Sequence, residues 1–339
     1  MTSAFTDQHR KAFVMAWVLL LASALLLLLG VSVGSTGFES VLNMQHDPHA
    51  MLIVGEIRLP RTLGAWLAGA LLGLAGAVAQ GLFRNPLADP YLLGSASGAS
   101  LGVATAMVSF GVSPLATHWL VRIGFTGAAF IGAVLAVLLT LLLAKGVQHT
   151  LRLLLAGVIV GVVLGALSSL LLLLNPDIMQ AMQSFMLGST GFVGWAACAV
   201  MAAVFVACMA AAWMMSHVLD GLALGEATAQ SLGLRLPQMR AALIGVLALA
   251  TGTAVAQTGL IAFVGLAAPH LVRSVVKTTH GRLIGLSSLM GAVLLLAADV
   301  LARGVIAPQE LPVGVLTAVL GGSYLLWLMH RATGRGAGL

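Results

Sequence analysis

The stretch that most resembles a catalytic motif is residues 84–102, which read RNPLADPYLLGSASGASLG. Residues 94–98 match the G-x-S-x-G pattern of serine hydrolases, with Ser97 at the position of the nucleophile. That pattern makes a nucleophile when the serine lies on a sharp turn between a strand and a helix and a histidine acts as base. Here a proline-rich turn precedes the serine and a glycine-rich helix start contains it. We therefore expect Ser97 to pack a helix against its neighbour, although an intramembrane serine hydrolase remains an alternative.

Nucleotide hydrolysis requires a phosphate-binding loop in which a glycine directly precedes a lysine. Lys11, Lys145 and Lys277 each follow a residue other than glycine. The two cysteines, Cys198 and Cys208, lie in one apolar run, where packing is expected instead of a disulfide or a metal site. The sequence therefore predicts a chain that is no enzyme and that holds neither a metal nor a cofactor.

The composition excludes a soluble domain. Of the 339 residues 60% are hydrophobic and 8% are charged, whereas soluble proteins carry about 25% charged residues. Mean hydropathy is +1.07. The net charge of +6 does not imply a nucleic-acid partner, because basic residues of membrane proteins gather at the cytoplasmic side. The sequence predicts a polytopic membrane protein whose main surroundings are lipid.

Windows of about 20 apolar residues, the length that crosses a bilayer, predict about ten transmembrane helices. The fold class is all-α, in one domain over residues 1–339. The first apolar stretch is longer than the roughly 7–15 residues of a signal peptide, so we expect it to be retained. The windows are 12–33, 60–81, 91–110, 119–144, 152–174, 192–215, 240–258, 261–276, 284–303 and 312–330.

The basic residues set the orientation. With the N-terminus inside, four arginines fall on the outer face, namely Arg58, Arg61, Arg122 and Arg303. The cytoplasmic segments then hold the other twelve, which are Arg10, Lys11, Arg84, Lys145, Arg152, Arg235, Arg240, Arg273, Lys277, Arg282, Arg331 and Arg335. The positive-inside rule therefore predicts that both termini are cytoplasmic.

Glycines recur at the spacing of helix packing. Four G-x-x-x-G pairs occur, at Gly69/Gly73, Gly98/Gly102, Gly157/Gly161 and Gly161/Gly165. Small residues at this spacing let two helix backbones approach closely in lipid. These pairs predict a closely packed bundle and carry no information about a substrate.

Residues 216–240, SHVLDGLALGEATAQSLGLRLPQMR, are too polar to span a membrane. Leucines alternate with polar residues, and Gly221, Gly225 and Gly233 allow short helices joined by tight turns. Two interpretations stay open at this point. The segment is either a plain surface loop or a docking surface for a cytoplasmic partner.

Five runs along the chain resemble one family, the permease subunits of binding-protein-dependent ABC importers for ferric siderophores, haem and vitamin B12. The runs are residues 58–102, RLLLAGV at 152–158, LALGEATAQSLGL at 222–234, GLIAFVGLAAPHLVR at 259–273 and residues 298–322. The resemblance implies a ten-helix importer subunit in a bacterial inner membrane. It implies a homodimer with two ATPase subunits, which bind ATP and Mg²⁺, and a periplasmic binding protein.

The resemblance also implies site residues. Arg58, Arg61 and Arg303 match arginines that dock the binding protein; bidentate pairing with carboxylates suits that role, and local pairing of Arg303 with Asp299 is the alternative. Gly157, Gly161 and Gly165 resemble the helix that lines the pathway. A cytoplasmic gate is implied at Asn85, Leu87, Thr150 and Leu151. The coupling contacts with the ATPase are implied at Asp220, Leu222, Leu224, Gly225, Glu226, Leu232, Gly233 and Arg235.

The cargo is the least determined feature. His46 and His49 precede Arg58 on the outer side and could contact haem iron, although loop histidines are usually solvated. SFMLGSTGFVGW at 184–195 also resembles haem permeases. We therefore expect haem, with a ferric siderophore or vitamin B12 as alternatives. An ion-coupled secondary transporter is the alternative of another class, for which Asp299 and His270 are the available ionisable residues.

Overall fold

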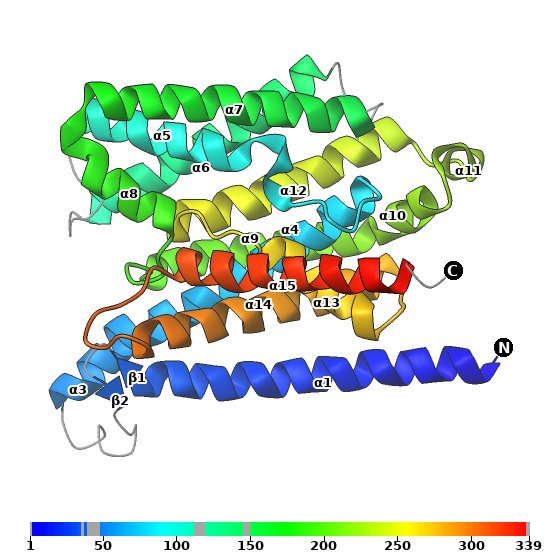
Figure 1. Ribbon diagram of the computed structural model, residues 1–339, viewed down its shortest axis with the longest axis horizontal. Helices are drawn as coiled ribbons and strands as arrows, with labels where there is room; N and C mark the ends of the chain where they lie inside the picture. The colour runs from blue at the N-terminus through cyan, green and yellow to red at the C-terminus, as the bar shows by residue number, and fades with distance from the viewer. Residues whose placement is uncertain (1, 35–36, 39–47, 112–118, 145–149, 337–339) are drawn as a thin grey trace.

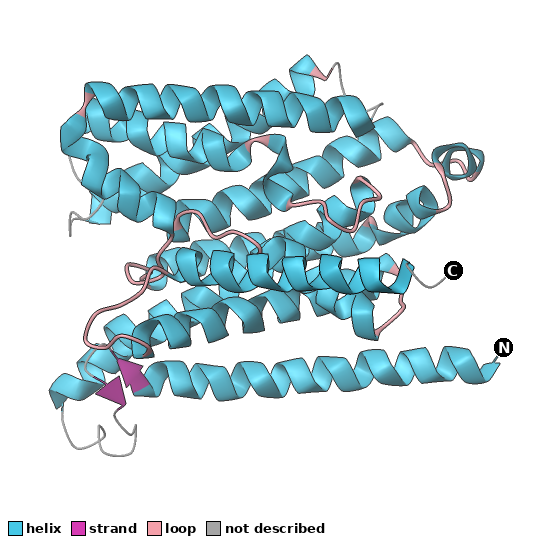
Figure 2. Cartoon of the chain, viewed as in Figure 1, coloured by secondary structure: helices cyan, strands magenta, loops and turns pink. Residues whose placement is uncertain are grey.

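The computed structural model describes residues 2–34, 37–38, 48–111, 119–144 and 150–336 as a bundle of helices (Figure 1). Strands are confined, among these residues, to the pair β1 (Val33–Gly34) and β2 (Gly37–Phe38), which are antiparallel (Figure 2). The predicted all-α fold class is confirmed.

Each predicted window corresponds to a helix. The ten helices are α1 (Thr2–Ser32), α4 (Leu59–Leu82), α5 (Ser95–Phe110), α6 (Trp119–Leu143), α7 (Thr150–Leu174), α9 (Trp195–Met214), α12 (Leu236–Thr258), α13 (Val264–Val275), α14 (His280–Gly304) and α15 (Val313–Gly336).

Seven of these helices, within the described residues, are long and apolar enough to cross a membrane, by length and composition. The remaining three are α5, α13 and α15. The apolar parts of α5 and α15 are shorter, at Ser95–Phe110 and Val313–Trp327. Helix α13 has 12 residues and is therefore about 18 Å long, less than the roughly 30 Å of a hydrocarbon core. The window 261–276 thus corresponds to a helix shorter than the window, because the chain before Val264 forms a turn with Phe263 at φ 68°.

Shorter elements connect the long helices. The windows did not predict α8, because its nine residues contain two glutamines and a serine and are too few for a span. These elements are α3 (Pro48–Ile53), the π-helical turn η1 (Val54–Arg58), the 3-10 turns η2 (Pro90–Leu93) and η3 (Pro176–Ile178), α8 (Met179–Leu187), α10 (Ser216–Ala223) and α11 (Glu226–Ser231).

Helix α4 lies at the centre of the bundle, and glycines set its distance from its neighbours. A Cβ atom added at Gly69 or Gly73 would overlap backbone carbonyl groups of α14, and one at Gly76 would overlap the carbonyl oxygen of Gly265 in α13. Gly98 and Gly102 bring α5 into the same close contact with α6. These pairs work as the spacing predicts, since backbone meets backbone where a side chain would not fit.

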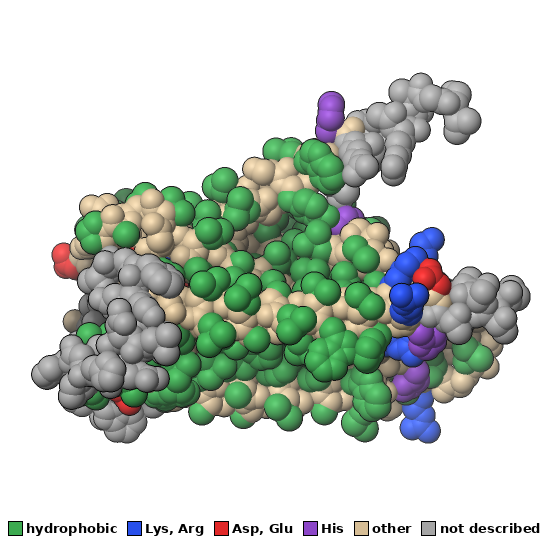
Figure 3. All heavy atoms as spheres, turned by 90° about the horizontal axis from the view of Figure 1, so that it is seen from below, with side chains coloured by type: hydrophobic (Ala, Val, Ile, Leu, Met, Phe, Trp, Pro, Cys, Tyr) green, Lys and Arg blue, Asp and Glu red, His purple; other side chains and the backbone are tan. Residues whose placement is uncertain are grey.

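The bundle has two chemically different ends. Both termini, α10 and α11 lie at one end, which we call the terminal end; α3, β1, β2 and α8 lie at the other, the distal end (Figure 1). Lysine and arginine side chains on the face seen in Figure 3 gather at the terminal end, and hydrophobic side chains cover much of the length between the ends. This distribution agrees with the bias on which the predicted orientation rests.

Candidate functional site

A cluster of charged side chains is buried at the distal end, around Asp299 of α14. Asp299 and Arg303 form an ion pair one helical turn apart, with exposed fractions of 0% and 1%. Arg61 of α4 donates from Nε and Nη2 to Asp299 Oδ1, both at 3.3 Å. Thr190 donates its hydroxyl to the same carboxylate oxygen. Because buried charge is stable only with close partners, Asp299 ties α4 and α14 to the loop between α8 and α9.

The cluster reaches solvent through Glu310 and reaches α1 through Arg303. Glu310 Oε2 lies 2.8 Å from Arg61 Nη1, and the exposed fractions of these side chains are 31% and 12%. Arg303 Nη1 donates to the carbonyl oxygen of Gly30 at 2.8 Å and to the hydroxyl of Thr62 at 3.3 Å. The cluster therefore joins α1, α4, α14 and the α14–α15 loop in one polar network.

The three arginines predicted for docking all lie at the distal end, but their charges are largely used inside the protein. Arg58 is 8% exposed, and its Nη1 donates to the carbonyl oxygen of Val31 at 3.4 Å. Arg303 makes the local pair with Asp299 that was the alternative to docking. Arg61 is paired with a partly exposed carboxylate, Glu310.

At the terminal end, the predicted coupling segment forms the short helices α10 and α11 joined by tight turns, as its glycines predict. Gly225 has φ 109° and Gly233 has φ 80°, values that glycine adopts without strain. The side chains of Leu224 and Leu232 are exposed, at 69% and 64%. With the exposed Arg235, they present apolar contact area and one positive charge to the outside.

Other residues of the coupling segment point inward. Leu222 is fully buried, so it anchors α10 in the bundle and does not offer an outer contact. Glu226 Oε1 lies 2.6 Å from Nη2 of Arg240, in the first turns of α12. Asp220 Oδ1 lies 2.7 Å from Nδ1 of His280, the first residue of α14. The segment thus has an outward apolar surface and inward polar anchors.

The predicted gate residues lie on the turn after α4 and at the start of α7. Asn85 accepts a hydrogen bond from the amide of Leu87 at 2.9 Å, which fixes this turn. Leu87 and Leu151 are exposed, at 51% and 71%. Thr150 begins α7, and its side chain lies outside the described parts of the chain. All four residues belong to the terminal end, where a cytoplasmic gate would lie; their role stays a prediction.

The turn beyond Leu87 is stabilised by a partly buried carboxylate. Asp89 Oδ1 accepts from the amide of Tyr91 at 2.8 Å, and the Tyr91 hydroxyl donates to the carbonyl oxygen of Ile261 at 3.1 Å. Burial raises the pKa of the Asp89 carboxyl above its ordinary value, and the amide hydrogen bond offsets part of that rise. Burial, followed by the charge of Asp89, raises the pKa of the Tyr91 hydroxyl. These bonds hold η2 against the connection between α12 and α13.

The three pathway glycines of α7 differ in their surroundings. A Cβ atom at Gly157 would overlap the carbonyl of Leu92, so this glycine serves close packing against η2. At Gly161 and Gly165 the nearest group is the Ser97 hydroxyl, at 3.7 and 4.0 Å from the added Cβ position. The hollow on this side of α7 has a volume of about 410 Å³ and is lined by Asp89, Tyr91, Leu92, Gly94, Ser97, Gly157, Val158, Gly161 and Val162.

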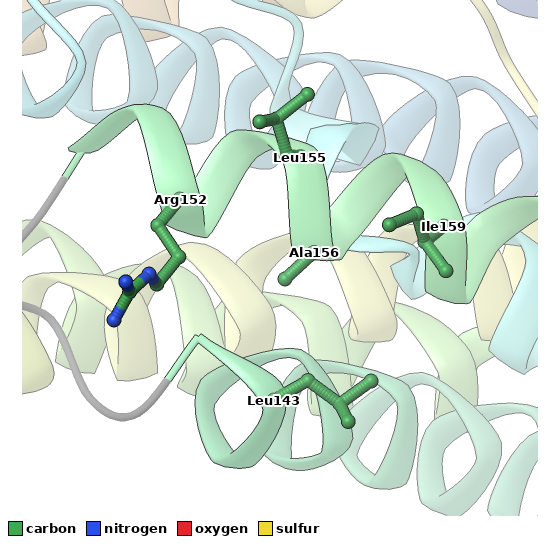
Figure 4. A pocket seen from close by; sticks show the side chains of 5 residues that line it. All are labelled: Leu143, Arg152, Leu155, Ala156 and Ile159. Atoms are coloured by element: carbon green, nitrogen blue, oxygen red, sulfur yellow. The ribbon is translucent and has the colours of Figure 1, made fainter.

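A second hollow of about 350 Å³ lies between α6 and α7. Figure 4 shows Leu143 on α6 and Arg152, Leu155, Ala156 and Ile159 on α7, with Arg152 at one end of the row. Its lining is apolar except for Arg152, so it offers no arrangement of groups for chemistry.

Ser97 does not have the geometry of a nucleophile. The segment before it is the 3-10 turn η2 with Gly94 at φ 80°, and Ser97 itself lies in the first turn of α5, so no strand leads into the serine. His270 packs edge-on against Tyr324, with ring centroids 6.0 Å apart. Among the histidines proposed for substrate contact, His46 lies outside the described residues, and only the helical backbone of His49, in α3, is described.

Three contributors were missed by reasoning from the sequence. Thr190 and Glu310 join the Asp299 cluster from loops, and His280 joins α14 to the coupling segment. Thr190 and Glu310 lie in runs that resemble the family, but in loops without a periodic pattern that would single out either residue. His280 could have been found, because a histidine at the start of a helix near an acidic segment can accept a carboxylate partner.

Comparisons with known proteins agree with this architecture. The model of the FecCD transport family matches residues 16–331. The hemin transport system permease protein HmuU of Yersinia pestis is 37% identical over 325 residues, covering 92% of this chain and 96% of that protein. The vitamin B12 import system permease protein BtuC of Shigella boydii serotype 18 is 37% identical over 320 residues, covering 93% and 95%. A solved structure, an inward-facing metal-chelate type ABC transporter, aligns with a TM-score of 0.83 at 28% identity, over 93% of this chain and 98% of that one.

Proposed function

The chain belongs to the FecCD transport family, and we propose that it is the membrane-spanning subunit of an importer that carries haem across a bacterial inner membrane. The observation that carries the proposal is the similarity over nearly the whole length to permeases named for haemin and for vitamin B12. Seven helices among the described residues are long and apolar enough to span a membrane, which suits this role. The sequence lacks a phosphate-binding loop, so the energy is proposed to come from separate ATPase subunits.

The terminal end is the proposed contact with the ATPase, on the cytoplasmic side. Leu224 and Leu232 are large apolar side chains that are exposed in this segment. An apolar anchor with a charged neighbour such as Arg235 is typical of a docking surface. Two copies of the chain are proposed to form a homodimer, with both termini cytoplasmic, and alternating access moves the cargo along the α7 face that carries Gly161 and Gly165.

The distal end is the proposed contact with a periplasmic binding protein. Arg58, Arg61 and Arg303 lie together there, and Arg61 pairs with Asp299 and Glu310 while Arg303 pairs with Asp299. Arginine pairs well with carboxylates, and complementary charge speeds docking. Arg61 is the residue at which we propose that carboxylates are exchanged. Glu310, which pairs with it, is partly exposed, so a carboxylate of the binding protein can take its place.

Haem is the proposed cargo, and the two relatives do not separate it from vitamin B12, since both are 37% identical. The test is uptake into proteoliposomes that contain this chain and its ATPase, with the binding protein outside. Haem, cyanocobalamin and a ferric siderophore are supplied in parallel. ATP-dependent uptake of haem supports the proposal; ATP-dependent uptake of one of the other two replaces haem as the cargo; uptake driven by an ion gradient without ATP rejects the importer.

A further inference from the structure

Helix α10 is joined to α14 by a contact that does not belong to its exposed apolar surface. Asp220 Oδ1 accepts two hydrogen bonds from the same residue of another helix, one from the His280 amide at 3.0 Å and one from its ring Nδ1 at 2.7 Å. The His280 and Asp220 side chains are 16% and 40% exposed. A carboxylate that accepts two hydrogen bonds from the first residue of a helix fixes both the position and the direction of that helix, because rotation of α14 would break both bonds.

The ring of His280 also rests on α4. A Cβ atom placed at Gly81 would lie 3.0 Å from Cδ2 of the His280 ring and 3.3 Å from a methyl group of Leu219 in α10. Leu219 is fully buried. Helices α4, α10 and α14 therefore meet at one point, where Gly81 leaves room for the imidazole ring.

From this point α14 runs to the opposite end of the bundle. Gly69 and Gly73 of α4 touch the backbone of α14 near Gly291, without space for a side chain. Close backbone packing of this kind resists sliding, because any shift drives carbonyl groups into neighbouring atoms. At its distal end α14 carries Asp299 and Arg303, which hold the buried charge cluster. A displacement of α10 at the terminal end thus has a continuous packed route to the distal end.

We propose that the Asp220–His280 contact is the positioning link through which movement of the coupling segment reaches α14. The inference rests on the proposed function and deepens it, since it names the residues that join the ATPase contact to the rest of the bundle. Asp220, although its side chain is 40% exposed, is bound to α14 by both hydrogen bonds from His280. Glu226 and Arg240 join α11 to α12 separately, by an ion pair at 2.6 Å.

The test uses the complete complex in proteoliposomes, with cargo uptake and ATP hydrolysis measured together. His280→Phe keeps an aromatic ring on Gly81 and removes the ring donor to Asp220, whereas His280→Asn restores a donor close to the position of Nδ1. We expect His280→Phe to keep ATP hydrolysis and to lower the uptake per ATP roughly tenfold or more, as the loss of a hydrogen bond to a charged group implies. His280→Asn should recover most of that loss.

The matched control is His217→Phe, the same substitution at an exposed histidine of α10 whose ring nitrogen contacts the carbonyl oxygen of Met214, in the preceding turn of the chain, at 2.9 Å. It should leave uptake per ATP unchanged. If His280→Phe does not fold, Asp220→Leu is used in its place. It removes the same contact by changing Asp220, the more exposed of the two side chains. Unchanged uptake per ATP in the variant that folds, or an equal loss in His280→Phe and His280→Asn, overturns the link while the importer stands. Absence of ATP-driven uptake in the unmodified complex overturns the proposed function and the link together.

Discussion

Replacing Asp299 by alanine tests whether the buried charge cluster holds the distal end together. The substitution removes the acceptor for Arg61, Arg303 and Thr190 in one step. Arg303, 1% exposed, would then be a buried cation without its carboxylate, while Arg61 would keep Glu310. Removing one partner of a buried ion pair costs about 3–5 kcal/mol, most of it from the charge left behind.

The expected result is a free energy of unfolding lower by about 3–5 kcal/mol. At roughly 2 °C per kcal/mol, the lower end of the range for large domains, the melting temperature in detergent should fall by about 6–10 °C. Asp177→Ala is the matched control, because Asp177 is an exposed carboxylate in η3, near α8 at the same end. A surface change of that kind should alter the free energy of unfolding by less than about 0.5 kcal/mol.

A double variant separates the charge from the loss of packing. Asp299→Ala with Arg303→Met removes both charges of the tightest pair, so it should be more stable than the sum of the two single variants predicts, by roughly 1–3 kcal/mol. The assay is thermal unfolding of the purified protein, followed by intrinsic fluorescence. A loss below about 1 kcal/mol for Asp299→Ala, with additive behaviour in the double variant, would refute the reasoning, since it would mean that the cluster is not a buried ionic network.

Three further predictions concern other parts of the bundle. Burial raises the pKa of Asp89 above 3.8, so the folded state binds the carboxyl proton more tightly than the unfolded state, and the stability that this proton contributes is lost as pH rises through the folded pKa. The melting temperature of Asp89→Asn, relative to that of the unmodified chain, should therefore rise between pH 4 and pH 8. A constant difference between the two melting temperatures would contradict this prediction. Gly76→Ala should lower the free energy of unfolding by about 1–3 kcal/mol, measured by thermal unfolding, because the added methyl group would overlap α13. The control is Gly285→Ala, where the added atom meets nothing within 4 Å; it should leave the free energy of unfolding unchanged or raise it by up to about 1 kcal/mol. Glu310→Gln should release Arg61 from its charged partner and tighten binding-protein affinity roughly threefold to tenfold in a surface binding assay; unchanged affinity would exclude Arg61 as the point of exchange.

The helices could be predicted from the sequence because hydrophobic length and glycine spacing are local properties. All ten windows overlap helices, and Gly69, Gly73, Gly98 and Gly102 make the close backbone contacts that their spacing predicts. The length of α13 could not be predicted, because the turn at Phe263 interrupts an apolar run without a proline or a charge at that position. Hydropathy depends only on which residues are present, whereas the left-handed backbone at Phe263 depends on contacts with other parts of the chain.

The sites were harder to predict than the helices. The sequence places Arg303 and Asp299 one turn apart, so their pairing was foreseeable, but Arg61 lies 238 residues from Asp299 and its contact needs the whole fold. The burial of Leu222 and the bond between Asp220 and His280 also depend on the packing of distant helices, which no spacing within residues 216–240 reveals. The polar contacts between segments far apart in the sequence therefore become visible only in the structure.

The central claim is that this chain is one subunit of an importer whose energy comes from a separate ATPase. The most direct measurement is quantitative mass spectrometry of the tagged chain after crosslinking and mild purification from its native membranes. We expect an ATP-binding cassette subunit in a one-to-one ratio with this chain. We expect that subunit to be lost when Leu224 and Leu232, the exposed residues that directly follow α10 and α11, are both replaced by Asp. A chain that purifies without any ATPase subunit, with and without crosslinking, would contradict the account and indicate a transporter that works alone.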